Sequence, residues 1–358
     1  MEIETKTGER GRTAVVLRTW DDYNYSETRR AWLRALITET ALHSGGDYEV
    51  FFLVNVKNND IRLDQDKNAY EQALREFVPE EFRDMAFLYN TRVLESWYPK
   101  VEEHGAQDQM YQALQIFSHK FPHFAHIWQL EMDLRLTSHV HTTLESTVAF
   151  TRAQPCRNLW ERNGRFYIPE LYNGSYEAFA AAVDADIGNT GVWGPAPTKI
   201  SNHPVGTDWI YEDKVYGFAD GAATPRRAAF VSMTRASGRL LRLISKVQRE
   251  RGQWVVSEAT LETFALLHGL KAVTVPHPIA FEDSVTTEAA DADINHGPPH
   301  NKAGGRAPSM SYTTKGFTPG PWFRASYWFA ADEAPNYWQQ YLEGKCMPPM
   351  LLHPAKDE

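Results

Sequence analysis

The sequence predicts an α/β fold with a mostly parallel sheet flanked by helices, because strand and helix patterns alternate over the first 140 residues. Polar or charged residues follow the predicted strands, and the second half is rich in turns and aromatic rings. With 358 residues, 42% hydrophobic and 23% charged, the chain is an ordinary globular one, long enough for one large α/β domain or two smaller ones.

The first two strands are apolar runs. TAVVLRTW (Thr13–Trp20) has β-branched character, and EVFFLVN (Glu49–Asn55) is continuously apolar, as expected for a strand covered on both faces. Between them, Ser26 is placed to cap a helix with one apolar stripe. A helix with Tyr70 and Phe77 on its apolar side, a strand MAFLYN and a helix beginning near Asp108 continue the alternation.

The stretch His126–His139 reads HIWQLEMDLRLTSH and alternates with a period of two, which predicts a strand. Glu131 and Asp133 then share one face with Cβ atoms roughly 6–7 Å apart. That spacing lets two carboxylates converge on one divalent cation, directly or through a water. The alternative is an amphipathic strand with a wet polar face, on which Arg135 neutralises one acid. Spacing alone does not separate the two.

Ligands of parallel α/β sheets bind outside the carboxyl ends of the strands. Polar residues occupy those ends on four successive predicted strands: Arg18, Thr19 and Asp21, then Asn55, then Asn90, then Glu131 and Asp133. Their shared location indicates a binding site.

Several function classes lack their motifs. The sequence has no G-x-G-x-x-G after the first strand, no P-loop and no G-x-S-x-G elbow. A net charge of −9 argues against nucleic acid as the main partner, and two cysteines cannot build a disulfide framework or a structural zinc site. An α/β domain remains that handles a nucleotide diphosphate through a metal held at an acidic strand end.

RTAVVLRTWDDYNYSETRRAWLRAL, EVFFLVN and HIWQLEMDLRLTSH together resemble a fungal family labelled as a domain of unknown function, and that family is similar to the GT-A class of nucleotide-sugar glycosyltransferases. The resemblance runs from about Thr13 to about Tyr341. It implies a GT-A-like (Rossmann-like) fold and transfer of a sugar from a nucleotide-diphosphate sugar to a small molecule or glycan. In GT-A enzymes the last acid of a D-x-D motif binds Mn²⁺ or Mg²⁺ on the donor diphosphate. Glu131-Met132-Asp133 matches that motif in form, with Glu in place of the first Asp.

The resemblance also implies residue roles. Arg18 and Thr19 would lie beside the nucleotide, with Asp21, Asn55 and Glu131 at the same strand ends. The alternative for Arg18 is an ion pair with a local acid, Asp21 or Asp22.

Two further roles fall in the second half. An acid at the start of a comparable GT-A helix faces the acceptor and acts as base, which points to Glu258; the alternative is an acid that the helix dipole favours. A further metal ligand in GT-A enzymes is commonly a His from the C-terminal region, which points to His300.

The chain divides, on this reading, into a flexible N-terminus (1–12), a nucleotide-sugar-binding half (13–150) and an acceptor-side half of the same domain (151–345). A polar, Gly- and Pro-rich segment (282–309) predicts a mobile loop that closes over the donor, and 346–358 a tail.

Three smaller elements are expected in the acceptor-side half. Pro225–Arg249 reads as a helix region, Ser257 as the cap of the next helix, and Ala272–Pro276 as a strand.

Two other functions use the same features. A metal-dependent phosphoesterase or sugar hydrolase would use the same acids without an acceptor. A non-catalytic carbohydrate-binding protein would use the aromatic rings, which include 11 Trp and 16 Tyr. The polar N-terminus predicts no signal peptide or membrane segment and a cytoplasmic protein as given; the alternative is a Golgi or secretory protein whose anchor has been removed.

Overall fold

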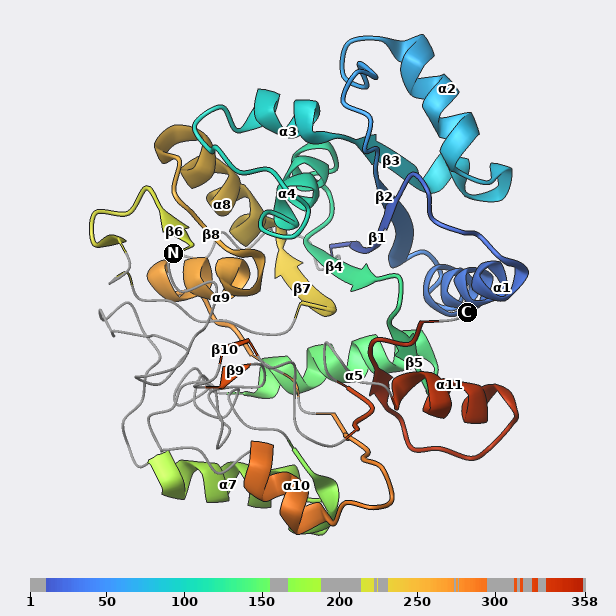
Figure 1. Ribbon diagram of the computed structural model, residues 1–358, viewed down its shortest axis with the longest axis vertical. Coiled ribbons are helices and arrows are strands. Elements are labelled where there is room, and N and C mark those ends of the chain that lie inside the picture. Colours follow the sequence, from blue (N-terminus) through green and yellow to red (C-terminus); the bar gives the residue numbers. More distant parts are fainter. Residues whose placement is uncertain are drawn as a thin grey trace. The chain divides into compact units, whose positions relative to one another are not determined.

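A five-stranded sheet organises the first part of the chain in a computed structural model of the protein (Figure 1). The structure describes residues 11–154, 167–187, 214–221, 224, 231–273, 275, 277–294, 312–313, 316–317, 324–327 and 333–356. Within them the strand order is β3-β2-β1-β4-β7. The first four strands are parallel and β7 is antiparallel to β4, which confirms the predicted mostly parallel sheet. The strands are β1 Thr13–Trp20, β2 Tyr48–Asn55, β3 Ala86–Tyr89, β4 His126–Glu131 and β7 Met233–Ser237.

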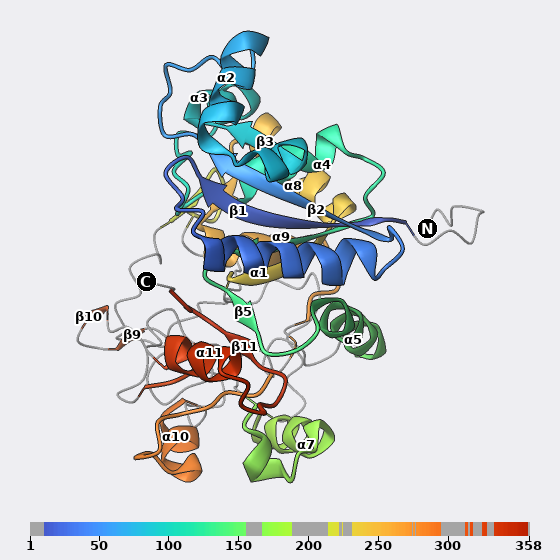
Figure 2. The same ribbon diagram turned by 90° about the vertical axis from the view of Figure 1, so that its right-hand side faces the viewer.

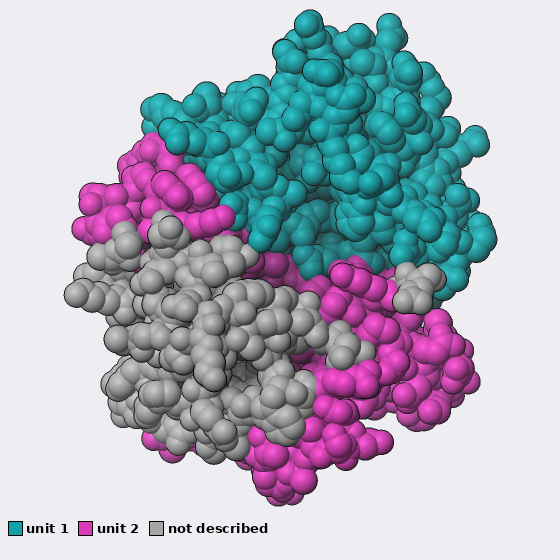
Figure 3. Space-filling view, in the orientation of Figure 1, with its two compact units in different colours: residues 1–132, 233–250 teal, residues 133–232, 251–358 magenta. Residues whose placement is uncertain are grey.

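The chain divides into two compact units, coloured separately in Figure 3. Unit 1 comprises residues 1–132 and 233–250 and contains the sheet. Unit 2 comprises residues 133–232 and 251–358.

Three α-helices of unit 1 begin where a polar side chain caps them, as expected at helix N-termini. Ser26 accepts a hydrogen bond from the Arg29 amide (3.4 Å), and Asp66 and Asn90 cap the next two α-helices in the same way. The helices are α1 Glu27–Ile37, the π-helical turn η1 Thr38–Leu42, α2 Lys67–Phe77, the 3₁₀ turn η2 Glu80–Met85, α3 Thr91–Trp97, α4 Tyr111–Lys120 and α8 Gly238–Arg251.

Neighbouring residues of β2 show that both sheet faces are covered. Phe51 packs against Phe117 of α4 (ring centroids 5.0 Å apart), whereas Phe52 points the other way and packs against Phe82 of η2 (5.3 Å). Figure 2 shows α1 running along one side of β1 and β2. The apolar runs TAVVLRTW and YEVFFLVN therefore form strands because burial on both faces stabilises them.

Unit 2 contains helices and short two-stranded pairings, with β5 paired to β11, β6 to β8 and β9 to β10, all antiparallel. Its helices are α5 Val140–Ala153, the 3₁₀ turn η3 Pro169–Tyr172, α7 Tyr176–Ile187, α9 Ser257–Leu267, α10 Thr287–Ile294 and α11 Ala334–Leu342. Its strands are β5 Arg135–Leu136, β6 Val215–Tyr216, β8 Trp254–Val255, β9 Tyr312–Thr313, β10 Gly316–Phe317 and β11 Leu351–Leu352. Among the helices of the described residues, none has the length and apolar character needed to cross a bilayer.

The prediction of one strand over His126–His139 is wrong. β4 ends at Glu131, Met132 and Asp133 form a turn, and the chain re-enters extended structure only at β5. The wet-face alternative is wrong as well, because Arg135 is buried, donates to the Leu134 carbonyl oxygen (2.8 Å) and lies over the ring of Trp338. Pairing of β5 with β11, distant in sequence, overrides the local alternation.

The region predicted as a helix over 225–249 contains β7 before α8 begins at Gly238, and residues 225–230 lie outside the described part. Ser257 is the first residue of α9 rather than its cap, which is Val256. The described residues 272, 273 and 275 are not in a strand.

Two predicted loops or tails contain regular structure. The segment expected to be a loop over 282–309 includes α10, and its residues from 295 onward lie outside the described part. The segment expected to be a tail, 346–358, includes β11.

Candidate functional site

The carboxyl edge of the sheet in unit 1 carries an ion pair between Arg18 and Glu131. The two residues are direct partners in the β1–β4 register, and Arg18 Nη2 donates to Glu131 Oε1. Both side chains are about four-fifths buried, so the pair is only partly screened by water. Arg18 Nη1 also donates to the Ala106 carbonyl oxygen (3.4 Å).

The alternative that Arg18 pairs with a local acid is wrong. Asp21 Oδ2 accepts a hydrogen bond from the Lys57 amide (2.8 Å), and Asp22 pairs with the Lys57 ammonium group (2.7 Å). The Asp21 amide in turn donates to the Asn55 carbonyl oxygen (3.1 Å), so the ends of β1 and β2 are joined.

The remaining strand-end residues are buried. Thr19 is buried within β1. The Asn90 side chain caps α3 and donates hydrogen bonds to the carbonyl oxygens of Asn58 and Ile61. These contacts give Asn90 a structural role. Tyr89 beside it is buried, which raises its pKa to about 12 although the charge of Arg18 opposes the change. Because the phenol of Tyr89 is neutral, it does not compete with Glu131 for the charge of the Arg18 guanidinium group.

In unit 2, Asp133 lies next to His353. Their Oδ1 and Nε2 atoms are 3.5 Å apart. Two contacts hold the segments together: β11 pairs with β5, and the Ala355 amide donates to the Asp133 carbonyl oxygen (2.7 Å). The His353 amide also donates to the Ser326 carbonyl oxygen (3.1 Å).

The environment of Asp133 favours its charged form. Burial acts to raise the pKa of this carboxyl group, but the hydrogen bond and charge of His353, a backbone hydrogen bond and the charge of Lys356 together outweigh it, so the pKa is lowered. A half-buried carboxylate beside an imidazole is a donor pair that can ligate a metal ion.

The sequence did not identify His353. The resemblance predicts a His from the C-terminal region as a further metal ligand and points to His300. His300 and His296 lie outside the described residues. The two leucines before His353 in LLHP are too few to form a periodic pattern, so the sequence does not single this residue out.

Glu258 is in the first turn of α9, as predicted, and one turn later is Glu262. Burial raises the pKa of Glu262 to about 8, and the charge of Glu258 adds to this effect. The structure does not include Glu258 in the group of metal-ligand type that contains Asp133 and His353.

A family model described as "Protein of unknown function (DUF3405)" matches residues 1–203 and 198–357. No curated protein matches the chain. Among solved structures, the apo form of mouse xyloside xylosyltransferase 1 is similar, with 12% identity, 73% of this chain and 85% of that chain covered, and a TM-score of 0.26. A TM-score of 0.26 is too low to support a conclusion about the function of this chain.

Proposed function

The chain belongs to the DUF3405 family of unknown function, and from its side chains we propose that it is a glycosyltransferase that uses a nucleotide-diphosphate sugar and a divalent cation. The observation that carries the proposal is the pairing of Asp133 with His353 immediately after the strand that ends at Glu131. The acid follows the carboxyl end of a central parallel strand, and α/β sheets bind phosphorylated ligands at that end of their strands.

The donor set fits a divalent cation. Asp133 offers a carboxylate oxygen and His353 an imidazole nitrogen, and Glu131 is two residues earlier in the chain, so connectivity keeps a second carboxylate close. Carboxylates suit both Mn²⁺ and Mg²⁺, but Mg²⁺ is usually held by oxygen ligands and waters, so the His favours Mn²⁺.

The cation, when bound, supplies positive charge that stabilises the diphosphate leaving group. Asp133 and His353 hold it, with His353 neutral as a ligand. Arg18 keeps Glu131 oriented at the strand end and supplies positive charge beside the nucleotide; Thr19, Asp21 and Asn55 shape the same edge. A small-molecule or glycan acceptor completes the reaction.

The first test replaces Asp133 by Asn, which keeps the size of the side chain and removes its charge. Mn²⁺ together with a nucleotide diphosphate should raise the melting temperature of the wild type and leave that of Asp133→Asn unchanged. Transfer from a panel of nucleotide sugars should fall by orders of magnitude in the variant. Asp47→Asn is the matched control, because Asp47 is an exposed acid before β2, at the opposite edge of the sheet.

Full transfer activity in a folded Asp133→Asn protein would falsify the proposal. Release of free sugar or phosphate at the same rate without an acceptor indicates the hydrolase instead. Sugar binding that neither nucleotide nor Mn²⁺ affects indicates a carbohydrate-binding protein.

Glu258 is proposed as the base that takes the acceptor proton. Glu258→Gln should then abolish transfer, while the thermal shift with Mn²⁺ and nucleotide diphosphate stays at the wild-type value, because donor binding does not need the base. Unchanged turnover would leave Glu258 only the role of a first-turn acid that interacts with the helix dipole.

A further inference from the structure

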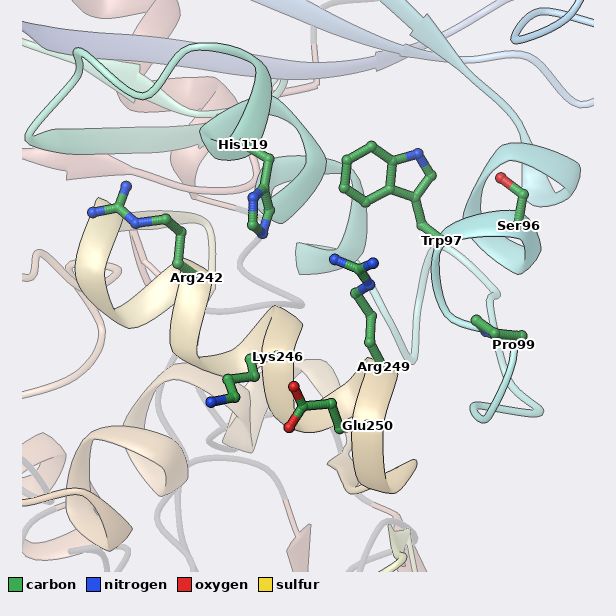
Figure 4. Close-up of a pocket in the computed structure, with 8 residues that line it drawn as sticks. All are labelled: Ser96, Trp97, Pro99, His119, Arg242, Lys246, Arg249 and Glu250. Carbon is green, nitrogen blue, oxygen red and sulfur yellow. The ribbon is translucent and has the colours of Figure 1, made fainter.

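A cavity lies in unit 1, on the outer side of the helices that cover the sheet (Figure 4). Its volume is about 540 Å³, and it is lined by the ends of α3 and α4 and by α8. The α8 residues that line it are exposed, whereas Leu241, Ile244 and Val247 of the same helix are buried toward the sheet. The cavity therefore lies on the side of α8 that faces away from the sheet.

The lining is rich in cations. Arg242, Lys246 and Arg249 are spaced by four and three residues, so they share one face of α8. Within the described part of the chain none of the three forms an ion pair. Lys100 lies next to the lining and donates to the Glu250 carbonyl oxygen (2.6 Å). Among the described residues that line the cavity, Glu250 is the one acid. Such a concentration of positive charge on a chain of net charge −9 attracts anions.

The opposite wall is aromatic. The ring of Trp97 lies 5.7 Å from that of His119, and the Arg249 guanidinium lies 5.6 Å from the indole centroid. His119 Nε2 is 3.2 Å from the buried Ser245 hydroxyl, which fixes the imidazole. Figure 4 shows the Arg249 side chain pointing toward Trp97 and His119, with His119 between Arg249 and Arg242, whereas Lys246 points away from the indole ring.

We propose that this cavity binds a small organic phosphate or sulfate ester, with the anion held beside His119 by Arg242 and Arg249 and the organic part on Trp97. Arg242 and Arg249, which form no ion pair with any described residue, supply charge-assisted hydrogen bonds to the ester oxygens, and Lys246 adds positive charge nearby. A volume of about 540 Å³ falls within the range of small-molecule sites, roughly 300–1,000 Å³, and is far larger than inorganic phosphate needs. The indole face offers apolar contact that only an organic ester uses.

His119 provides a local probe of occupancy. Burial lowers its pKa, and the charges of Arg249 and Arg242 lower it further. An anion bound between these groups screens the two guanidinium groups, so the pKa of His119 should rise on binding.

The experiment titrates the protein with glucose 6-phosphate, inorganic phosphate and glucose, measuring heats of binding and the His119 imidazole resonances. Glucose 6-phosphate should bind at least about tenfold more tightly than inorganic phosphate, and glucose should not bind. Arg242→Ala combined with Arg249→Ala should weaken binding about a hundredfold, since each charged hydrogen bond contributes roughly tenfold or more. Trp97→Leu should bring the affinity for glucose 6-phosphate down to that for inorganic phosphate.

Two controls separate this site from others. Arg239→Ala removes an exposed cation of the same helix that does not line the cavity, and binding should not change. Asp133→Asn should also bind normally; loss of binding there would place the probe in the donor site and overturn the proposal. Equal affinity for phosphate and its ester, or binding to phosphatidylserine vesicles without binding to glucose 6-phosphate, would overturn it as well.

Discussion

Glu262 is a partly buried residue one turn after Glu258 on α9. Its Oε2 atom is buried and has no hydrogen-bond partner among the described residues. Its pKa is raised from 4.5 to about 8. Between these values the folded protein binds a proton that the unfolded chain has released. The free energy of unfolding therefore falls as the pH rises from about 5 to 8.

Glu262→Gln, which is neutral at every pH, should remove this dependence. Relative to wild type, the variant should gain about 1–3 kcal/mol of stability on going from pH 5 to pH 8. Urea denaturation at the two pH values measures it. As a control, Glu76→Gln at an exposed position of α2 should change the free energy of unfolding by the same amount at pH 5 and pH 8. If Glu262→Gln also changed it by the same amount at the two pH values, the raised pKa of Glu262 would be contradicted.

Single residues of the site were predictable where the backbone decides their place. Arg18 and Glu131 meet because parallel strands bring their carboxyl ends to one edge, and the alternating strand pattern places both there. The sequence predicts Asp133 within a strand, whereas it lies in a turn, and no pattern singles out His353. Their proximity depends on β5 pairing with β11, two strands of two residues each, which leave no periodic signal in the sequence.

Among elements, α1 shows the strongest local signals: a Ser cap, an acid in its first turn and an apolar stripe containing the buried Leu33 and Leu36. Ser26→Ala should lower the free energy of unfolding by about 1 kcal/mol, because the Arg29 amide loses its acceptor. Denaturant titration measures this cost, and Ser26→Asp should restore most of it. Equal loss in both variants would mean that the cap contributes nothing.

β7 is the element that local signals could not reveal. Met233–Ser237 reads MTRAS, which has neither apolar alternation nor β-branched density, and most of its side chains are only partly buried. It is a strand because β4 offers it a partner, with Trp128 opposite Arg235. Edge strands of this kind depend on tertiary pairing more than on propensity. β1 and β2, by contrast, are predictable because burial on both faces requires apolar residues at nearly every position.

At the scale of the whole molecule, the protection of backbone amides against hydrogen exchange should follow the strand order of the sheet. β1 lies between β2 and β4 and its residues Ala14–Leu17 are fully buried, so opening it requires loss of the sheet. Hydrogen exchange followed by mass spectrometry should find peptides of β1 the slowest and those of β3 and β7, at the two edges, faster. Faster exchange in β1 than in β7 would contradict the order of the sheet.

The position of β7 in the chain has a consequence for synthesis on the ribosome. β4 ends at Glu131, but the strand that covers its second edge begins at Met233, after all of residues 133–232 have been made. At roughly 5–20 residues per second, that interval lasts on the order of 5–20 seconds. During it the nascent sheet presents the backbone groups of β4 without a partner, and such an edge recruits strands from other chains. The chain therefore depends on protection of one strand edge before it can complete its own sheet.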